Sequence, residues 1–508
     1  MRHAAALAFV LCLTAASAAQ DHSGHAPAVA GRIPAEILVR PVPLRDGIGR
    51  VSHPTSTTSK EAQAFYEQGL AYLHSYVWLE AARSFNQAIR LDGDFALAWV
   101  GLSRAYSGLE DPKLAREALA KAQTFTAVTP REARWIAVRA TQLDAMEAPR
   151  DKRDDAHAVY IAALNDALEG DPTDAELWSQ RGNAEEPGGA YGRGQRGTAS
   201  SIAFYERALA QAPGHFGAHH YLIHSYESIG HFDKALEHGK AYSDAASQVP
   251  HALHMYGHDL MKVGRMAEAI AIFERAHGLE NEYYAREDIA RDYDWHHAHN
   301  TGLLALSHRH GGNLDEAERL LRDGASVDQQ TAARKGYYKG VLLDLLYARG
   351  AHAEVIAEAT TLTKWKPPAV RKLGHAMAAR SLMASGRMND AAAHVAALEA
   401  AESEDGMYGT FADLHAGLAR GEYELRTGRR AEGAARLREV IAEARAQRTP
   451  DGWIEGLFTI ESAFQVAVAV DEWDLAADAS ARLVDHDKAY AGAKTAASTL
   501  ERRRQRLQ

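Results

Sequence analysis

Apolar positions along this chain of 508 residues recur with a long period. One set of large, small and aromatic residues is repeated about 34 residues later, which is the length of a helix-turn-helix unit. Spacings of three and four within each set place its members on one helix face. The first set is Phe65, Gly69, Tyr72, Ala81, Phe85 and Ala88, and the second is Trp99, Leu102, Tyr106, Ala115 and Ala122. The pattern predicts paired helices and no sheet.

The same pattern returns further along the chain. Later units contain His219, Leu222, Tyr226, Gly230 and Ala235, then Leu253, Gly257, Gly264, Ala269, Phe273 and Ala276, then Leu304, Gly312 and Ala317, with fainter units around Gly350, Gly386 and Gly428. These positions resemble the tetratricopeptide repeat (TPR). The resemblance implies an all-α fold, a right-handed TPR-type α-solenoid in which stacked helix-turn-helix repeats bury each other's apolar faces.

The first residues predict export. A short positive start is followed by an apolar run over residues 4–16 and by small residues at 17–19, as in a secretory signal peptide. This run is too short to span a bilayer. We therefore expect a protein that does not span the membrane and is periplasmic or secreted. The only cysteine, Cys12, lies inside this segment, so any metal would be held by His, Asp or Glu.

We expect five segments. They are a signal peptide over residues 1–19, an extended leader over 20–59, N-terminal TPR units over 60–145, central TPR units with a histidine-rich concave groove over 146–330, and degenerate TPR-like helical repeats over 331–508. The net charge of −10, without a basic patch, argues against nucleic acid as a ligand.

Histidines gather in the central units: 15 of the 26 lie between His215 and His310. In repeats that this chain resembles, positions two, five, nine and twelve of the first helix face the concave groove. A helix starting at Pro250 places His251, His254 and His258 at three of these positions, because spacings of three and four share a face. All three are therefore expected on one stripe of the groove.

Neighbouring units extend this stripe. A helix starting at Phe216 brings His220, His224 and Glu227 to the groove. The unit that follows Pro250 adds His299 at position two, with His296 one turn before it and Asn300 beside it. On the other side, the unit around Trp178 offers Asn183 and Glu186. Turns or convex positions are expected for His215, His231, His238 and His277.

Histidines four apart on a helix are a chelating arrangement for transition metals. The pairs His220/His224 and His254/His258 have this spacing. The sequence predicts a centre of three or four imidazoles and one carboxylate that binds zinc or copper. Its candidate ligands are His220, His224, His251, His254, His258, His299 and Glu227, and other groove contacts are Asn183, Glu186, His296 and Asn300.

Most of the chain also resembles a group of bacterial TPR proteins. Two segments carry this resemblance. The opening segment consists of residues 61–65, 69–70, 74–76 and 80–85. The central segment combines Ala-His-His-Tyr-Leu-Ile-His over residues 218–224 with Pro-His-Ala-Leu-His-Met over residues 250–255. Relatives usually have Pro-Ser-His where this chain has Tyr256, Gly257 and His258. The group implies the fold but brings no established reaction.

Two functions are compatible with these features. In the first, the protein is a binding or scaffold protein, and its groove holds a protein or peptide partner, or a small ligand, with or without a metal. In the second, the His/Glu cluster is the catalytic centre of a metal-dependent enzyme, in which Glu227 or Glu186 serves as general base for a metal-bound water.

Overall fold

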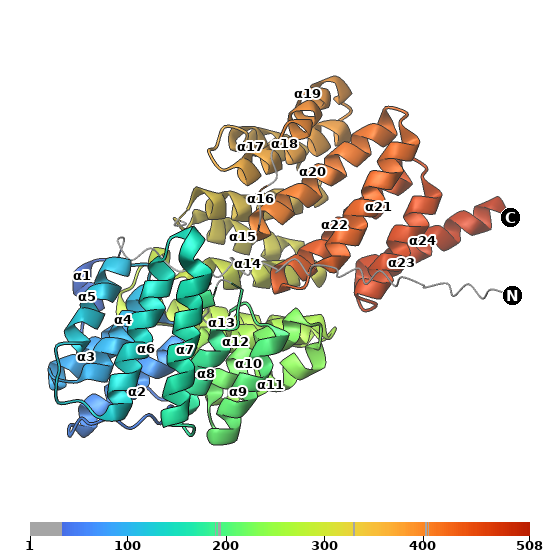
Figure 1. Cartoon of the computed structure of the whole chain (residues 1–508). Coiled ribbons are helices and arrows are strands. Elements are labelled where there is room, and N and C mark those ends of the chain that lie inside the picture. Colours follow the sequence, from blue (N-terminus) through green and yellow to red (C-terminus); the bar gives the residue numbers. More distant parts are fainter. Residues whose placement is uncertain (1–32, 188, 192–194, 329–330, 402–403, 405) are drawn as a thin grey trace, which may run out of the picture.

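The computed structural model describes residues 33–187, 189–191, 195–328, 331–401, 404 and 406–508. The predicted signal peptide and Cys12 lie outside these residues. The described chain forms 24 α-helices and no strands (Figure 1). Successive helices pack in antiparallel pairs, so the predicted all-α solenoid is confirmed.

The helix pairs follow one another along the chain. In the first half they are α2 (Lys60–His74) with α3 (Trp78–Leu91), α4 (Ala96–Gly108) with α5 (Pro112–Ala122), α6 (Pro130–Glu147) with α7 (Arg153–Gly170), α8 (Ala175–Asn183) with α9 (Ala199–Gln211), α10 (Phe216–Ser228) with α11 (Phe232–Ala245), and α12 (Pro250–Lys262) with α13 (Met266–Glu287). The two central helices begin at the predicted residues, Phe216 and Pro250.

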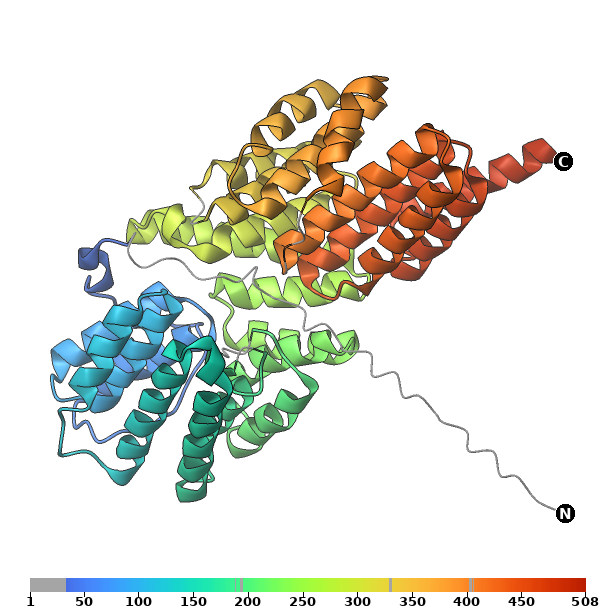
Figure 2. The same cartoon turned by 45° about the horizontal axis from the view of Figure 1, so that its top comes forward.

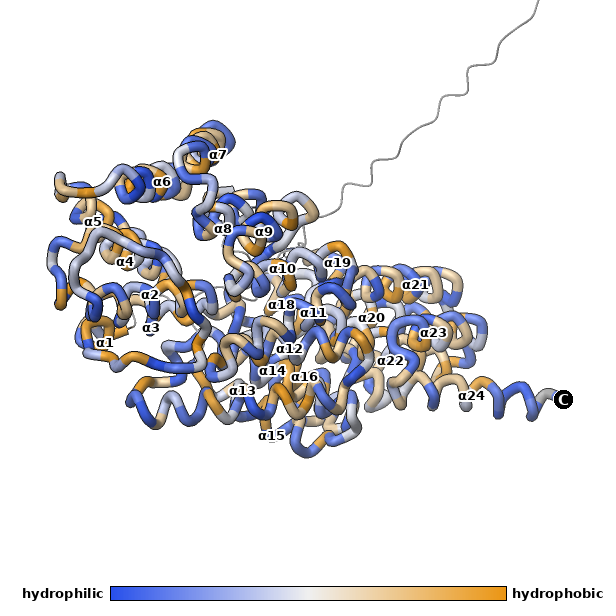
Figure 3. The backbone as a smooth tube through the Cα atoms, turned by 90° about the horizontal axis from the view of Figure 1, so that it is seen from below, coloured by the Kyte–Doolittle hydropathy of each residue, from blue (hydrophilic) through white to orange (hydrophobic). Residues whose placement is uncertain are grey.

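The second half continues in the same way. Its pairs are α14 (Trp295–His310) with α15 (Leu314–Ser326), α16 (Ala332–Ala348) with α17 (His352–Leu362), α18 (Pro368–Ala384) with α19 (Met388–Glu399), α20 (Met407–Arg426) with α21 (Arg430–Ala446), and α22 (Pro450–Ala469) with α23 (Trp473–His486), followed by α24 (Ala491–Leu507). Hydrophobic and hydrophilic stretches alternate along most helices, as expected for amphipathic elements (Figure 3).

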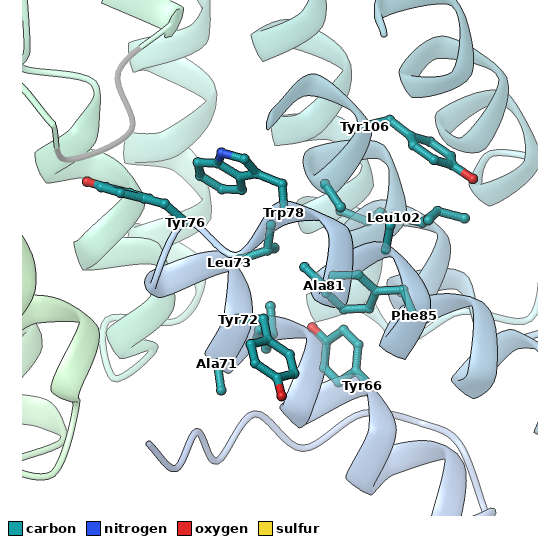
Figure 4. Packing of buried hydrophobic residues seen from close by; sticks show 14 of the residues in the cluster. Tyr66, Ala71, Tyr72, Leu73, Tyr76, Trp78, Ala81, Phe85, Leu102 and Tyr106 are labelled. Atoms are coloured by element: carbon teal, nitrogen blue, oxygen red, sulfur yellow. The ribbon is translucent and has the colours of Figure 1, made fainter. Parts of the chain in front are cut away.

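The small residues of the repeat let aromatic rings pack between helices. The ring of Phe85 on α3 lies against both Gly69 and Gly101, where an added Cβ would come within 2.6 and 2.4 Å of it. The ring of Phe273 lies in the same way against Gly257. Figure 4 shows Phe85 inside this first aromatic core. Glycine at these positions therefore sets how closely the paired helices approach.

Nine turns inside helix pairs share one backbone feature. Two residues after the first helix ends, the chain adopts a left-handed conformation, with φ between 56° and 91°. Six of these residues are the glycines Gly230, Gly264, Gly312, Gly350, Gly386 and Gly428, which adopt this conformation without strain. The other three are Tyr76, Glu110 and Asp471. Tyr76 is the only aromatic residue among the nine.

The described part of the leader is extended apart from α1 (Ala35–Leu38), and it packs on the helices. Ile37 and Ile48 are buried, and Gly47 O accepts a hydrogen bond from Gln248 N at 2.8 Å. Asn86 donates to Leu38 O at 3.0 Å. The leader thus joins the first helix pair to the turn before α12. The boundaries at 145 and 330 stay predictions, and α6 spans the first of them.

Two large hydrophobic cores meet at α12 and α14. One contains Met255 and Trp295 and extends back to the leader, and the other contains Leu260 and Ala298 and extends to α24. In Figures 1 and 2, α14 lies between the two groups of helices. The array also curls back on itself, because α2 packs against α10 and α22 packs against α12 and α14. The predicted histidine positions lie in this junction.

Candidate metal centre

Three imidazoles from two neighbouring helices come together at the junction. His220 and His224 lie one turn apart on α10, and His251 lies in the first turn of α12. One ligand nitrogen from each ring lies within 4.8 Å of the other two. The Nε2 atoms of His220 and His251 are 3.1 Å apart. These three predicted ligands are therefore brought together as the helix register requires.

His220 is fixed by the first helix pair. Its Nδ1 atom donates a hydrogen bond to His74 O at 2.6 Å, because a carbonyl only accepts. Its ring also stacks on Tyr242, with centroids 4.6 Å apart. Burial lowers the pKa of His220 to about 3. His220 is therefore neutral and directs the lone pair of Nε2 at His251, as a metal ligand must.

A second set of imidazoles continues from the first. The ring centroids of His254 and His296 are 4.7 Å apart, and those of His254 and His299 are 4.6 Å apart. His254 Nδ1 lies 3.1 Å from Asn300 Oδ1, and His296 Nδ1 lies 2.6 Å from Glu280 Oε1. Burial, followed by the neighbouring histidines, lowers the pKa of His254 well below its usual value.

Helix α14 begins three residues earlier than the predicted register. Asp294 caps it by accepting from His296 N, so His296 and His299 occupy positions two and five. Those are the groove positions of the repeat, which explains why His296 points toward His251, with centroids 4.8 Å apart. The sequence register missed this because a capping aspartate moved the start of the helix.

Glu227 and His258 form an ionic group next to the three imidazoles, with Glu227 Oε2 4.0 Å from His224 Nδ1. Glu227 Oε1 accepts from His258 Nδ1 and from Lys262 Nζ, both at 2.9 Å. Burial would raise the pKa of Glu227, but Lys262 and His258 hold it well below its usual value. Burial and Glu227 raise the pKa of Asp259 well above its usual value. A carboxylate already neutralised by lysine is a weak base, which argues against Glu227 as a catalytic proton acceptor.

The remaining candidate contacts are engaged in packing. Asn183 Oδ1 accepts a hydrogen bond from Tyr205 OH at 2.8 Å, so this amide joins α8 to α9. Glu186 is buried beside the same tyrosine. Neither belongs to a group of His, Asp and Glu side chains within ligand distance among the described residues.

Several residues around the centre were not predicted. Glu280 on α13 accepts from His296, His297 and Asn300, and Asp451 on α22 lies 3.4 Å from His299 Nδ1. Burial would raise the pKa of Glu280, but the two histidines hold it far below its usual value. The repeat pattern does not predict these carboxylates, because they belong to other helix pairs than the histidines that they contact.

His215 lies at a turn, as predicted, because it is the N-cap residue of α10, whereas His277 lies inside α13. His215 is buried and its Nε2 lies 3.2 Å from Glu176 Oε1, which also accepts from His74. His277 lies partly buried beside Glu280 and His297. Curvature of the array brings both side chains into contact with residues of other helices.

The candidate ligands are buried. His220, His224, His251, His254, His258 and His299 are each at most 3% exposed. Helix α2 packs on α10 from one side and α22 packs on α12 and α14 from the other. The side chains predicted to face an open groove therefore lie in an interior that these helices cover.

A cavity of about 390 Å³ opens beside the histidines. Its walls include His251 and His296 together with the aromatic residues Tyr72, Tyr76, Trp78, Tyr283 and Trp295. Figure 4 shows Tyr76 and Trp78 projecting from the turn between α2 and α3. A volume of this size suits a small-molecule ligand.

Three further groups of side chains among the described residues have ligand atoms within 4.8 Å. They are His74/Glu176/His215, His277/Glu280/His297 and Glu227/His258/Asp259. Each contains a carboxylate that already accepts a hydrogen bond from one of its histidines. His220/His224/His251 alone among the four consists of imidazoles only.

The sequence matches no protein-family model and no curated protein. Two solved structures are weakly similar to this chain. The crystal structure of PilW, a widely conserved type IV pilus biogenesis factor, is 18% identical over 52% of this chain and 93% of its own, with a TM-score of 0.26. Yeast Tom70 is 11% identical over 83% of this chain and 92% of its own, with a TM-score of 0.37. The fold of this chain rests on its own helices, which are stacked in successive pairs as in an α-solenoid.

No helix in the described part of the chain is both long and apolar enough to cross a bilayer.

Proposed function

We propose that this protein is an exported TPR-type binding protein that holds one transition metal ion at His220, His224 and His251. The observation that carries the proposal is the 3.1 Å separation between His220 Nε2 and His251 Nε2, with His224 within ligand distance of both. Two nitrogen ligands of tetrahedral zinc lie about 3.3 Å apart, given bonds of about 2.0–2.1 Å. The two rings therefore need only a small adjustment to share an ion.

The hydrogen bonds in this group suit metal binding. Because His220 Nδ1 donates to His74 O, Nε2 of the neutral ring is an acceptor, and the proton between the two Nε2 atoms belongs to His251. A metal ion would replace this single proton. Neutral imidazoles favour zinc or copper, and the residues that the structure describes contain no cysteine.

The binding role is supported by the fold and by the cavity. TPR-type solenoids bury apolar faces between units and present a large inner surface. Here that surface leads to a cavity bordered by His251 and His296. The signal-like first residues support export, and the ligand of the cavity would be a small molecule or a segment of a protein or peptide partner.

A metal-dependent enzyme is the second candidate. The observation that favours it is the direct contact between the cavity and His251, since a ligand there would lie next to the metal. Glu227 is held by Lys262, so it is an unsuitable general base. The enzyme would need another general base, and the pair formed by His296 and Glu280 would serve as this proton acceptor in place of Glu227.

Elemental analysis of the purified protein tests the first proposal. We expect about one equivalent of zinc or copper after loading and dialysis, and none in His220→Ala/His251→Ala. The matched control is His375→Ala/His394→Ala, which removes a facing pair of imidazoles on α18 and α19 whose Nδ1 atoms are 3.0 Å apart. Equal metal content in both variants would contradict the proposed centre.

Turnover assays separate the two candidates. The metal-loaded and metal-free proteins would be compared for hydrolysis and for oxidation of small aromatic substrates. Metal-dependent turnover lost in His296→Gln supports the enzyme, and metal binding without turnover supports the binding protein.

A further inference from the structure

Acidic side chains outnumber basic ones in the wall of the cavity. Both arginines of the wall, Arg45 and Arg286, already form ion pairs with Glu287, which lies outside it. The wall itself contains four carboxyl groups, those of Asp46, Glu80, Glu280 and Asp294. A positively charged ligand is therefore attracted to this wall more strongly than a negatively charged one.

Two of these carboxyl groups are already occupied within the fold. Both oxygens of Glu280 accept hydrogen bonds from side chains of α14. Both oxygens of Asp294 also accept hydrogen bonds, one from Tyr284 OH and one from the backbone at the start of α14. The other two carboxyl groups are Asp46, which is exposed, and Glu80, which is mostly buried.

Glu80 keeps one carboxylate oxygen available to a ligand. Its Oε1 accepts from Arg83 Nη1 at 2.6 Å and from Tyr283 OH at 2.8 Å. Its Oε2 has no hydrogen-bond partner among the described residues and is not sealed from solvent. Burial raises the pKa of Glu80, but Arg83, which can only donate, opposes this shift and favours the ionised carboxylate.

Tyr72 supplies a second oxygen to the same wall. Burial, followed by the nearby charge of Glu80, raises the pKa of its hydroxyl above the usual value, so this hydroxyl stays neutral. Within the described part of the chain it has no hydrogen-bond partner, and it too is not sealed from solvent. A protonated primary amine carries three N–H donors and can therefore use both oxygens.

Much of the remaining wall is aromatic. Tyr76 and Trp78 follow α2, and Trp295 begins α14. Tyr76 adopts the left-handed backbone conformation that glycine has in six equivalent turns, with φ of 56°. Strain of this kind at a cavity wall indicates that its ring has a role there. Aromatic rings attract cations and also pack well on an apolar body.

We infer that this cavity binds a small primary amine in its protonated form, whose ammonium group pairs with Glu80 and whose apolar body packs on the aromatic wall. A volume of about 390 Å³ lies in the range of small-molecule sites. The inference rests on the binding function proposed for this cavity. It does not depend on the metal, because neither Glu80 nor Tyr72 is among the candidate ligands of the centre.

Three probes test the inference by calorimetry on the full chain after treatment with EDTA. They share a phenyl ring and a similar length but differ in charge, since phenethylamine is a cation, 2-phenylethanol is neutral and 3-phenylpropionate is an anion. We expect phenethylamine to bind about tenfold more tightly than 2-phenylethanol, the effect of about one hydrogen bond to a charged group. We expect 3-phenylpropionate to bind more weakly than either.

The variant Glu80→Gln locates the ammonium group. Arg83 keeps its ion pair with Glu287 at 3.2 Å in this variant, so the buried guanidinium is still neutralised. The ratio of the affinities for phenethylamine and 2-phenylethanol should fall to less than about threefold. The matched control is Glu424→Gln, which changes another buried carboxylate paired with an arginine, on α20 and outside the cavity wall. Its ratio should equal that of the wild type.

The wild-type measurement alone can overturn the inference. Binding of 2-phenylethanol or 3-phenylpropionate as tight as that of phenethylamine, or no saturable binding of phenethylamine below about 1 mM, would each do so. An unchanged ratio in Glu80→Gln would also overturn it, because the amine would then bind elsewhere. Amine binding by metal-free protein supports the cavity site even if the elemental analysis finds no metal. A metal at the histidines without amine binding would leave only the metal proposal.

Discussion

His251 Nε2 and His220 Nε2 face each other at 3.1 Å, although the residues belong to different helix pairs. The contact depends on the stacking of two successive repeats, since α10 and α12 are equivalent helices of neighbouring units. It also depends on the first repeat, whose His74 carbonyl orients His220. The centre is thus a product of the curvature that brings α2 back to α10.

Substituting Gly69 tests the packing of the repeat. An added Cβ would come within 2.6 Å of the ring of Phe85, which is also enclosed by Gly101. We expect Gly69→Ala to lower the free energy of unfolding by about 1–3 kcal/mol, as overpacking does. Chemical denaturation measures this. The control is Gly93→Ala at an exposed turn with no atom within 4 Å, and an equal effect there would contradict the packing argument.

Removing Lys262 tests the ionic group beside the centre. The side chains of Lys262 and Glu227 are almost fully buried and lie 2.9 Å apart. Because Lys262→Met leaves a buried carboxylate without its cation, we expect a loss of about 3–5 kcal/mol in unfolding free energy. The double variant Lys262→Met/Glu227→Gln should recover part of that loss. A double variant less stable than Lys262→Met would show that the unpaired Glu227 carboxylate is not the cause of the loss.

Acid should destabilise the protein through its buried histidines. Burial lowers the pKa of His415 to about 4, although Asp344 nearby opposes the shift. Below about pH 6.5 the His415 side chain is protonated in the unfolded chain but stays neutral in the folded protein. The free energy of unfolding therefore falls as the pH drops from about 6.5 toward 4. We expect His415→Asn to lessen the stability difference between pH 7.5 and 5 by on the order of 1 kcal/mol. Urea denaturation at the two pH values measures it, and an unchanged difference would contradict the assignment.

Metal binding should stabilise the folded protein. An ion at 100 times its dissociation constant adds about 2.7 kcal/mol to a protein that binds it only when folded. We expect zinc or copper to raise the unfolding temperature of the wild type and of His375→Ala/His394→Ala, but not of His220→Ala/His251→Ala. Differential scanning calorimetry with and without EDTA distinguishes these outcomes. A rise in all three proteins would place the stabilising ion elsewhere.

The sequence predicted the local geometry of the centre better than its surroundings. The starts of α10 and α12 follow from the repeat pattern, and this places His220, His224 and His251 correctly on their helices. The start of α14 depended on the Asp294 cap, which the repeat pattern does not include. Local periodicity fixes which side chains share a face of one helix.

Contacts across the array could not be predicted in this way. Glu280 and Asp451 reach the histidines from α13 and α22, and Tyr76 reaches them from the first turn. Such contacts depend on the small rotation between successive repeats, which accumulates over many units. Because these rotations accumulate, other helices cover the predicted groove, and a cavity lies beside the histidines instead.

Anomalous diffraction from crystals loaded with zinc tests the central claim most directly. The account predicts one strong peak between α10 and α12, about 2.0–2.1 Å from nitrogen atoms of His220 and His251, with His224 turned toward it. A peak at Glu227 and His258 instead, or no peak among the buried histidines at saturating zinc, would contradict it.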